Sequence, residues 1–403
     1  MPQKNFIVRE PLLGPKQQVL GYALNWQQAA TEGDAAAAES VALAETVAQH
    51  LVDPESGWLL ENSVLFLPAT AALLASDALQ DVPAKNIVLT LEAEALADPQ
   101  LLESLRESRT RGFGVALRVA DVSRFDKSLL SLASHIEVHF NPGDLASQAR
   151  IYGALKASSV RIIARHIENW QQYDASAALG LDAFVGKLHL TPRPGAVSKG
   201  LNPSQGVVLQ LMNMVRRNAD ARELESMLRR DAALSFKLLR YINSAGFGRG
   251  TEISSLRHAV TMLGYTPLFR WLSLLLATAS TTGYSPVLMQ TAVIRGRFTE
   301  LLGASQQAPG GAENLFVAGL FSLLDRLLGV PMEQVLQKMQ LSDELAQAML
   351  TRQGIYGDYL ALAEACELDS ALVGAMAAAL HLDADTVNQH HLAAVAWSHN
   401  LQL

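Results

Sequence analysis

The chain has 403 residues, of which 49% are hydrophobic and 18% are charged, so a largely disordered chain is excluded and two domains are expected. Its net charge of −7 excludes a chain-wide basic surface, and we expect no nucleic-acid partner. Its single cysteine, Cys366, excludes a disulfide within one chain and indicates a reducing compartment.

The chain begins with MPQKNFIVREP, which carries charges where a signal peptide needs an apolar run. The longest apolar stretch of the second half, residues 271–279, is shorter than the about 20 residues that cross a bilayer. We therefore expect a cytoplasmic protein without a membrane segment.

Short runs rich in Val, Ile and Phe alternate with Ala- and Leu-rich helical runs in the first half. The predicted strands cover residues 6–12, 19–26, 63–68, 86–92, 114–119, 135–140, 160–165 and 183–186. Helices are predicted near residues 34–52, 69–79, 98–109, 143–157 and 168–179. About eight strands separated by helices predict a (β/α)-barrel with a mainly parallel sheet.

A segment with three prolines and two glycines, residues 192–203, is the predicted linker. It divides the chain into domains 1–195 and 196–403. Leucines at spacings of three to four dominate the second domain, so we expect six to ten helices and no strand there. The Ala-rich run 371–380 is expected to be a buried helix.

Two patterns admit a weak chemical interpretation. His135, Glu137 and His139 share one face of a predicted strand and could hold a divalent ion, or the two histidines could lie too far apart at its two ends. The glycine-rich segment 246–250 follows a helical pattern and not a strand, so a helix end is a better interpretation than a phosphate loop.

Arg118, His139 and Arg165 each lie late in a predicted strand. In a barrel they would meet at the mouth formed by the carboxyl ends of the strands, where sites are usually built. They could form a cationic mouth that holds an anion, because arginine pairs well with phosphate. Alternatively, they could pair with Glu92, Glu137 or Glu168 in a structural network.

The second half carries two motifs, RDAALSFKLLRYINSAGFG at 230–248 and ISSLRHAVTMLG at 253–264. These resemble the HDOD domain, an all-helical relative of the HD phosphohydrolases, except that Ala232 replaces a proline. The matching positions that we single out are Asp231, Lys237, Asn243, Ser244, Phe247, His258 and Gly264. The resemblance implies a helical bundle that acts in signalling or protein interaction, and the chain contains no His-Asp pair of the kind that HD hydrolases use to hold metal.

The first half resembles the EAL domain, a barrel that hydrolyses cyclic di-GMP with divalent metals. The resemblance rests on FIVREP at 6–11, VLGYAL at 19–24, GFGVALRVA at 112–120, IEVH at 136–139, ARHIE at 164–168 and FVGK at 184–187. Together with the HDOD-like half, it covers nearly the whole chain. An EAL–HDOD pairing is a recognised signalling architecture.

The departures from the EAL pattern fall on its acidic positions. The signature glutamate is Ala23, two metal-binding aspartates are Arg118 and Val119, and a glutamate is Arg165. Further changes are Glu137 for lysine, His139 for aspartate and Val185 for glutamine, while Glu168 remains acidic. Because two-metal hydrolysis needs carboxylates and arginine cannot bind magnesium, the resemblance implies a degenerate barrel.

We therefore expect a bacterial-type signal-transduction protein that is not an enzyme, with no catalytic residue, metal or cofactor. It would act as a scaffold for unidentified signalling proteins, and a homodimer is compatible with this. The alternative is a metal-independent cyclic di-GMP receptor whose ligand-binding residues are Arg118, His139, Arg165 and Glu168 at the barrel mouth. An enzyme of another kind would require clustered carboxylates that the sequence does not supply.

Overall fold

The computed structural model describes residues 5–30, 33–52, 60, 63–121, 125–141, 143–186, 203–244, 255–278, 286–304 and 311–400. The contacts between backbone segments divide the chain into two units. The barrel unit comprises Met1–Pro194, Ser285–Val287 and Glu364–Asn400. The helical unit comprises Gly195–Tyr284, Leu288–Ala363 and Leu401–Leu403.

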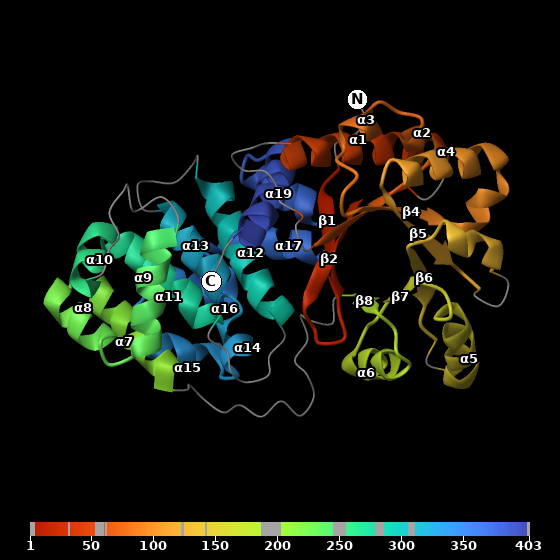
Figure 1. Ribbon diagram of the computed structural model, residues 1–403. Helices are drawn as coiled ribbons and strands as arrows, with labels where there is room; N and C mark the ends of the chain where they lie inside the picture. The colour runs from red at the N-terminus through yellow and green to blue at the C-terminus, as the bar shows by residue number, and fades with distance from the viewer. Residues whose placement is uncertain are drawn as a thin grey trace. The chain divides into compact units, whose positions relative to one another are not determined.

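Eight strands close into a barrel in chain order, which confirms the predicted (β/α)-barrel (Figure 1). Strand β1 runs antiparallel to both of its neighbours, β2 and β8, and every other pair of neighbouring strands is parallel. The strands are β1 (Ile7–Leu13), β2 (Val19–Trp26), β3 (Val64–Pro68), β4 (Ile87–Glu92), β5 (Gly114–Val119), β6 (His135–His139), β7 (Arg161–Arg165) and β8 (Ala183–Val185). Their bounds agree with the predicted strands to within two residues.

The lower part of the barrel interior is filled by apolar side chains from alternate positions of the strands, as the two-residue period of a strand requires. This cluster contains Leu12, Ala23, Phe66, Val88, Ala116, Ile163, Ala183 and Val185. Strands β2 and β3 approach closely at Gly21, where an added Cβ would lie 1.8 Å from the Val64 carbonyl oxygen. A glycine is therefore required at this point of the barrel wall.

Helices between the strands cover the outside of the barrel. They are α1 (Gly33–Val52), α2 (Ala71–Leu74), α3 (Ala78–Asp81), α4 (Pro99–Thr110), α5 (Leu145–Leu155) and α6 (Trp170–Ala178), with 3₁₀ turns η1 (Ala93–Ala97) and η3 (Lys127–Ser131). The single helix predicted near 69–79 is two short helices. The first of them begins at Thr70, whose side chain caps it by accepting a hydrogen bond from the Leu73 amide.

The C-terminal helix of the chain belongs to the barrel unit. Helix α19 (Ala384–Asn400) packs against α1, and the side chain of Asn388 bonds to the backbone of the first strand region. The Ile7 amide donates to Asn388 Oδ1 at 2.8 Å, and Asn388 Nδ2 donates to the Asn5 carbonyl at 3.0 Å. The sequence placed one boundary at residue 195, whereas these contacts group Glu364–Asn400 with the barrel.

The rest of the described chain is helical, in agreement with the predicted all-helical second half. Its helices are α7 (Pro203–Arg216), α8 (Ala221–Leu228), α9 (Ala232–Ser244), α10 (Leu256–Leu263), α11 (Tyr265–Thr278), α12 (Pro286–Gly303), α13 (Gly311–Phe321), α14 (Leu324–Leu328), α15 (Met332–Gln337), α16 (Asp343–Thr351), α17 (Gly357–Leu368) and α18 (Val373–Ala379). With α19, the described residues from 203 to 400 form thirteen helices.

Two expectations about this half were wrong. More helices form than the six to ten expected, because several turns are made by capping residues such as Asp220 and Ser342 and contain no glycine or proline. Helix α18 is not buried, because only Val373 and Ala377, four positions apart, turn inward. The glycine-rich segment 246–250 and the linker up to residue 202 lie outside the described residues.

No single helix within the described ranges is both long and apolar enough to cross a membrane, although the bent pair α10 and α11, at 109°, meets these criteria jointly.

Candidate functional site

The candidate site lies inside the barrel at the carboxyl ends of the parallel strands. Neighbouring strands place Glu92 beside Arg118, Arg118 beside Glu137, and His139 beside Arg165. The side chains of Arg118, Glu137 and Arg165 occupy alternate positions that face the interior, above the apolar cluster. The strand register therefore brings opposite charges side by side.

Glu137 is the centre of an ion-pair network. Its Oε2 accepts a hydrogen bond from Arg118 Nε at 2.9 Å and from Arg165 Nη1 at 3.2 Å. Arg165 Nη2 also reaches Glu10 Oε2 at 3.2 Å, and Arg118 Nη1 lies 3.5 Å from Glu92 Oε1. Both guanidinium groups are thereby shared between two carboxylates, which suits their fixed, forked geometry.

The network is buried at its centre and open at one side. The side chain of Glu137 is 2% exposed, that of Arg165 is 15% exposed and that of Arg118 is 29% exposed. Three carboxylates thus face two guanidinium groups. The two arginines therefore form the structural network that was the alternative to an anion-binding mouth, with Glu92 and Glu137 as expected partners, Glu10 as an additional one and Glu168 outside it.

His139 and Glu168 do not join the network. The exposed ring of His139 lies 5.1 Å from the ring of His166, and burial together with Arg165 lowers the pKa of His166. Glu168 is exposed, and its amide donates to Gln172 Oε1 at 2.8 Å at the start of α6. Of the four predicted ligand-binding residues, the structure brings Arg118 and Arg165 together on Glu137.

A buried histidine lies at the other end of strand β6. The side chain of His135 packs edge-on against Phe66, and its Nδ1 lies 2.9 Å from Ser134 Oγ. Burial, followed by the charge of Arg161, lowers the pKa of His135 to about 4, so the ring is neutral at pH 7. His135 and His139 therefore occupy different environments and do not face a common ligand.

These residues do not fit the divalent metals that the EAL resemblance implies. Among the described residues, no group of three histidine, cysteine, aspartate or glutamate side chains is arranged to hold a metal ion. The carboxylates at the mouth face guanidinium groups, which carry positive charge and have no lone pair to donate. We therefore derive no metal-dependent step at this site.

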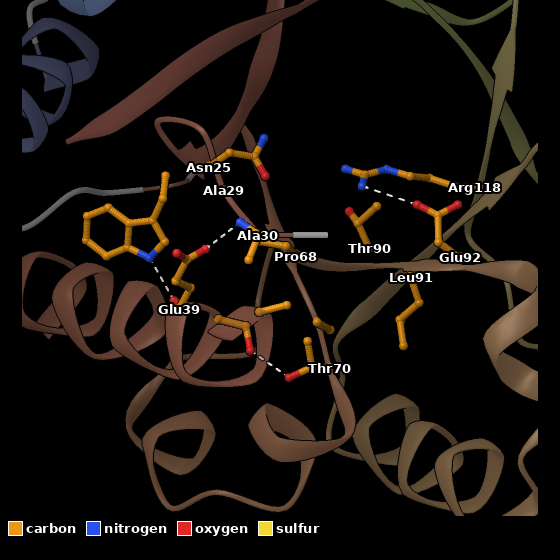
Figure 2. Close-up of a pocket in the computed structure, with 14 residues that line it drawn as sticks. Asn25, Ala29, Ala30, Glu39, Pro68, Thr70, Thr90, Leu91, Glu92 and Arg118 are labelled. Atoms are coloured by element: carbon orange, nitrogen blue, oxygen red, sulfur yellow. Dashed lines mark hydrogen bonds and ion pairs between the residues drawn. The ribbon is translucent and has the colours of Figure 1, made fainter. Parts of the chain in front are cut away.

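A cavity of about 210 Å³ opens beside the network, between the ends of β2 to β5 and helix α1 (Figure 2). Its wall includes Asn25, Glu39, Thr90 and Arg118. Thr90 is 3% exposed, and its Oγ1 has no hydrogen-bond partner in the described part of the chain. An unsatisfied buried hydroxyl is costly, so the cavity wall offers a group that a polar ligand would satisfy.

Two residues of this site were not predicted from the sequence. Glu10 lies 155 residues from its partner Arg165, and only the antiparallel insertion of β1 between β2 and β8 brings it to the mouth. Thr90 lies within the apolar run of β4, a pattern that predicts a core residue. The alternation of inward positions along β1 and β4 was the available signal for both residues.

The HDOD motif residues have separate structural roles. Asp231 caps α9, since its Oδ1 accepts from the Leu234 amide at 3.0 Å, and Gly264 adopts a φ of 78° between α10 and α11. Lys237 on α9 and His258 on α10 are exposed. Asn243 and Ser244 form the last turn of α9, and Phe247 lies outside the described residues.

Comparison with protein families identifies the class of the helical part. Residues 201–378 match the family model of the HDOD domain, which confirms that interpretation of the motifs. The chain therefore carries an HDOD domain that follows, in the sequence, the eight strands of the closed barrel.

Individual relatives span almost the whole chain. It is 24% identical over 408 residues to the uncharacterized protein YuxH of Bacillus subtilis, covering 98% of both chains. It is 25% identical over 414 residues to cyclic di-GMP phosphodiesterase CdgJ of Vibrio cholerae, covering 98% of this chain and 93% of CdgJ. Structural neighbours include the EAL domain of Mycobacterium smegmatis DcpA, with a TM-score of 0.36, 16% identity and coverage of 45% of this chain and 89% of that chain.

Proposed function

We propose that the chain is a signal-transduction protein without phosphodiesterase activity, in which the HDOD domain binds a partner protein and the barrel is a non-catalytic support. The observation that carries the proposal is the pairing of Arg118 and Arg165 with the buried Glu137. In this arrangement the positive charge between the carboxylates at the barrel mouth is supplied by the protein itself.

The occupied carboxylates of the mouth support a barrel that binds no divalent cation. The carboxylate oxygens that could bind a metal ion already accept hydrogen bonds from the guanidinium groups, which have no lone pair to offer a metal. Metal activation of water, which phosphodiester hydrolysis by the EAL pattern needs, therefore has no support here.

A hydrolysis assay against CdgJ tests this proposal. Because CdgJ is named a cyclic di-GMP phosphodiesterase, it is the matched positive control under identical magnesium and manganese concentrations. We expect linear product to form with CdgJ and none to form with this chain. Metal-dependent product formation by this chain, lost on Glu137→Gln, would overturn the proposal.

The cavity beside Arg118 favours a second candidate function, a metal-independent receptor for cyclic di-GMP. Arginine pairs with phosphate, and the unsatisfied Thr90 hydroxyl offers a further polar contact. Calorimetric titration with cyclic di-GMP in the presence of EDTA tests this candidate.

The receptor function predicts micromolar binding that falls by about tenfold or more in Arg118→Ala and by less in Thr90→Val. Arg106→Ala, which removes an exposed arginine of α4, is the matched control and should bind like the parent chain. The absence of binding heat would remove the receptor and leave the scaffold as the function to pursue.

A further inference from the structure

Two neighbouring helices of the helical unit each expose a large apolar side chain beside cations. On α9, Phe236 is 64% exposed and is flanked by Lys237 and Arg240. On α10, Met262 is 50% exposed. The α9–α10 face is the set of exposed side chains Phe236, Lys237, Arg240, Arg257, His258 and Met262.

The helical period places these residues on the outer sides of two helices that pack together. Positions 236, 237 and 240 share one side of α9, opposite the buried Leu238 and Ile242. Helix α10 turns Val260 and Leu263 inward. Figure 1 shows α8, α9 and α10 as neighbours, and each of the three contacts the other two.

A buried carboxylate fixes one cation of this face in place. Glu225 on α8 is 7% exposed at its side chain and accepts from Arg257 Nε at 2.7 Å. These hydrogen bonds, together with those from Arg229, lower the pKa of Glu225. Arg257 remains 52% exposed, so it is anchored at one edge of its guanidinium group and open at the other.

Two other cations of the face, Lys237 and Arg240, are not paired within the described part of the chain. Nine Lys and Arg residues against five Asp and Glu residues lie between positions 216 and 258, a net charge of +4 in a chain whose total is −7. This stretch of sequence, which contains α9 and the start of α10, is therefore basic in an acidic chain.

We propose that the α9–α10 face binds an acidic amphipathic segment of a partner protein. Carboxylates of the segment would pair with Lys237 and Arg240, and its apolar side chains would pack on Phe236 and Met262. This inference rests on the proposed interaction role of the HDOD domain and adds the chemistry of the partner. An apolar centre with charged surroundings is the usual composition of a protein–protein contact.

The charge distribution favours a short acidic segment over an extended polyanion. The remainder of the chain is acidic, with a net charge of −11 outside positions 216–258, given −7 in total and +4 within, so a polyanion that extended beyond the basic stretch would be repelled. A segment of limited length contacts the basic region alone. The phosphate backbone of a nucleic acid would also leave Phe236 and Met262 without an apolar partner.

Fluorescence anisotropy on the full chain tests the proposal with defined probes. The first probe is a labelled peptide of about 20 residues with Leu and Glu at helical spacing, and the second is the same peptide with Gln in place of Glu. A DNA duplex of about 20 base pairs and vesicles of phosphatidylglycerol with phosphatidylcholine are the competing ligands.

We expect the Glu peptide to bind at least about tenfold more tightly than the Gln peptide, and more weakly at higher salt. Phe236→Ala and the double variant Lys237→Glu/Arg240→Glu should each weaken binding about tenfold or more. The matched controls are Ile355→Ala, another exposed apolar residue, and Lys16→Glu/Lys85→Glu, which changes the net charge equally on the barrel unit. The controls should bind like the parent chain.

Equal binding of the two peptides, equal loss in the controls, or tighter face-dependent binding of DNA or vesicles would overturn the inference. These outcomes are independent of the hydrolysis assay. If the chain neither hydrolyses cyclic di-GMP nor binds the Glu peptide, only this inference is overturned. If the chain hydrolyses cyclic di-GMP, the proposed non-catalytic function is overturned and the peptide result is unaffected.

Discussion

The barrel mouth and the α9–α10 face both contain basic side chains, but those at the mouth are paired with carboxylates and those on α9 have no described ion-pair partner. At the mouth, Arg118 and Arg165 share the buried Glu137. On α9, Lys237 and Arg240 project into solvent without a described ion-pair partner. A charge that is already paired contributes to the fold, whereas an unpaired charge on an exposed helix is available to a partner. This contrast matches the two roles that we propose, a support for the barrel and partner binding for the helical domain.

The first prediction targets the paired charges and has the largest expected effect. Replacing Glu137 with Gln leaves Arg165, which is 15% exposed, without its central carboxylate. We expect the free energy of unfolding of the barrel unit to fall by about 3 kcal/mol, because a broken buried pair leaves an uncompensated charge. Urea unfolding of the full chain, followed by tryptophan fluorescence, measures this loss.

An exposed pair provides the control for this measurement. Glu103 and Arg106 on α4 lie 3.1 Å apart, and their side chains are 64% and 55% exposed. Glu103→Gln should change the free energy of unfolding by less than about 1 kcal/mol. Similar losses in the Glu137 and Glu103 variants would remove the distinction between a structural network and a surface pair.

The second prediction concerns pH and the neutral histidine of the barrel interior. The pKa of His135 is about 4 in the folded chain and about 6.5 when unfolded, so between these values only the unfolded chain takes up the proton. The resulting stability is complete above pH 6.5 and is lost as the pH falls towards 4. At pH 5 the loss reaches about 2 kcal/mol relative to pH 7.

Urea unfolding at pH 7 and pH 5 measures this effect in three chains. His135→Gln should reduce the decrease in stability between the two pH values by the same amount. His139→Gln, which changes an exposed histidine of the same strand, should behave like the parent chain. An unchanged pH dependence in the His135 variant would contradict the burial of a neutral ring at this position.

The third prediction has the smallest expected effect and completes the comparison. Lys237→Ala/Arg240→Ala should change the free energy of unfolding by less than about 0.5 kcal/mol, because neither side chain forms an ion pair with any residue that the structure describes. Thermal unfolding of the full chain is sufficient to check this. A loss of unfolding free energy comparable to that of Glu137→Gln would show that these cations stabilise the fold and are not available to a partner.

The strands were predictable because each is a short Val-, Ile- or Leu-rich run between turn residues. Closure into a barrel followed from the alternation with helices. The helical half was harder, since breaks such as Arg229–Asp231 lack the glycine and proline that mark turns in a sequence. Asp231 ends one helix and caps the next through a hydrogen bond that no periodicity reveals.

The candidate site was predictable in part, since Arg118, Arg165 and Glu137 were singled out from the sequence, whereas Glu10 and Thr90 were not. The late positions of Arg118 and Arg165 in their strands correctly placed both at the mouth. The net charge of the side chains at the mouth depends on Glu10, which reaches Arg165 through the pairing of β1 with β8. Such pairings between distant strands depend on tertiary structure, so local patterns could not supply them.

The position of helix α19 has a consequence for the order in which the molecule is made. Asn388 bonds to the Ile7 amide, 381 positions earlier in the chain. At about 5–20 residues per second, a ribosome reaches Asn388 roughly 20–80 seconds after it has passed Ile7. Most of the helical unit is therefore synthesised between the first strand and Asn388. This hydrogen bond therefore forms only after translation has passed Asn388, and a chain terminated before this residue leaves the Ile7 amide without this acceptor.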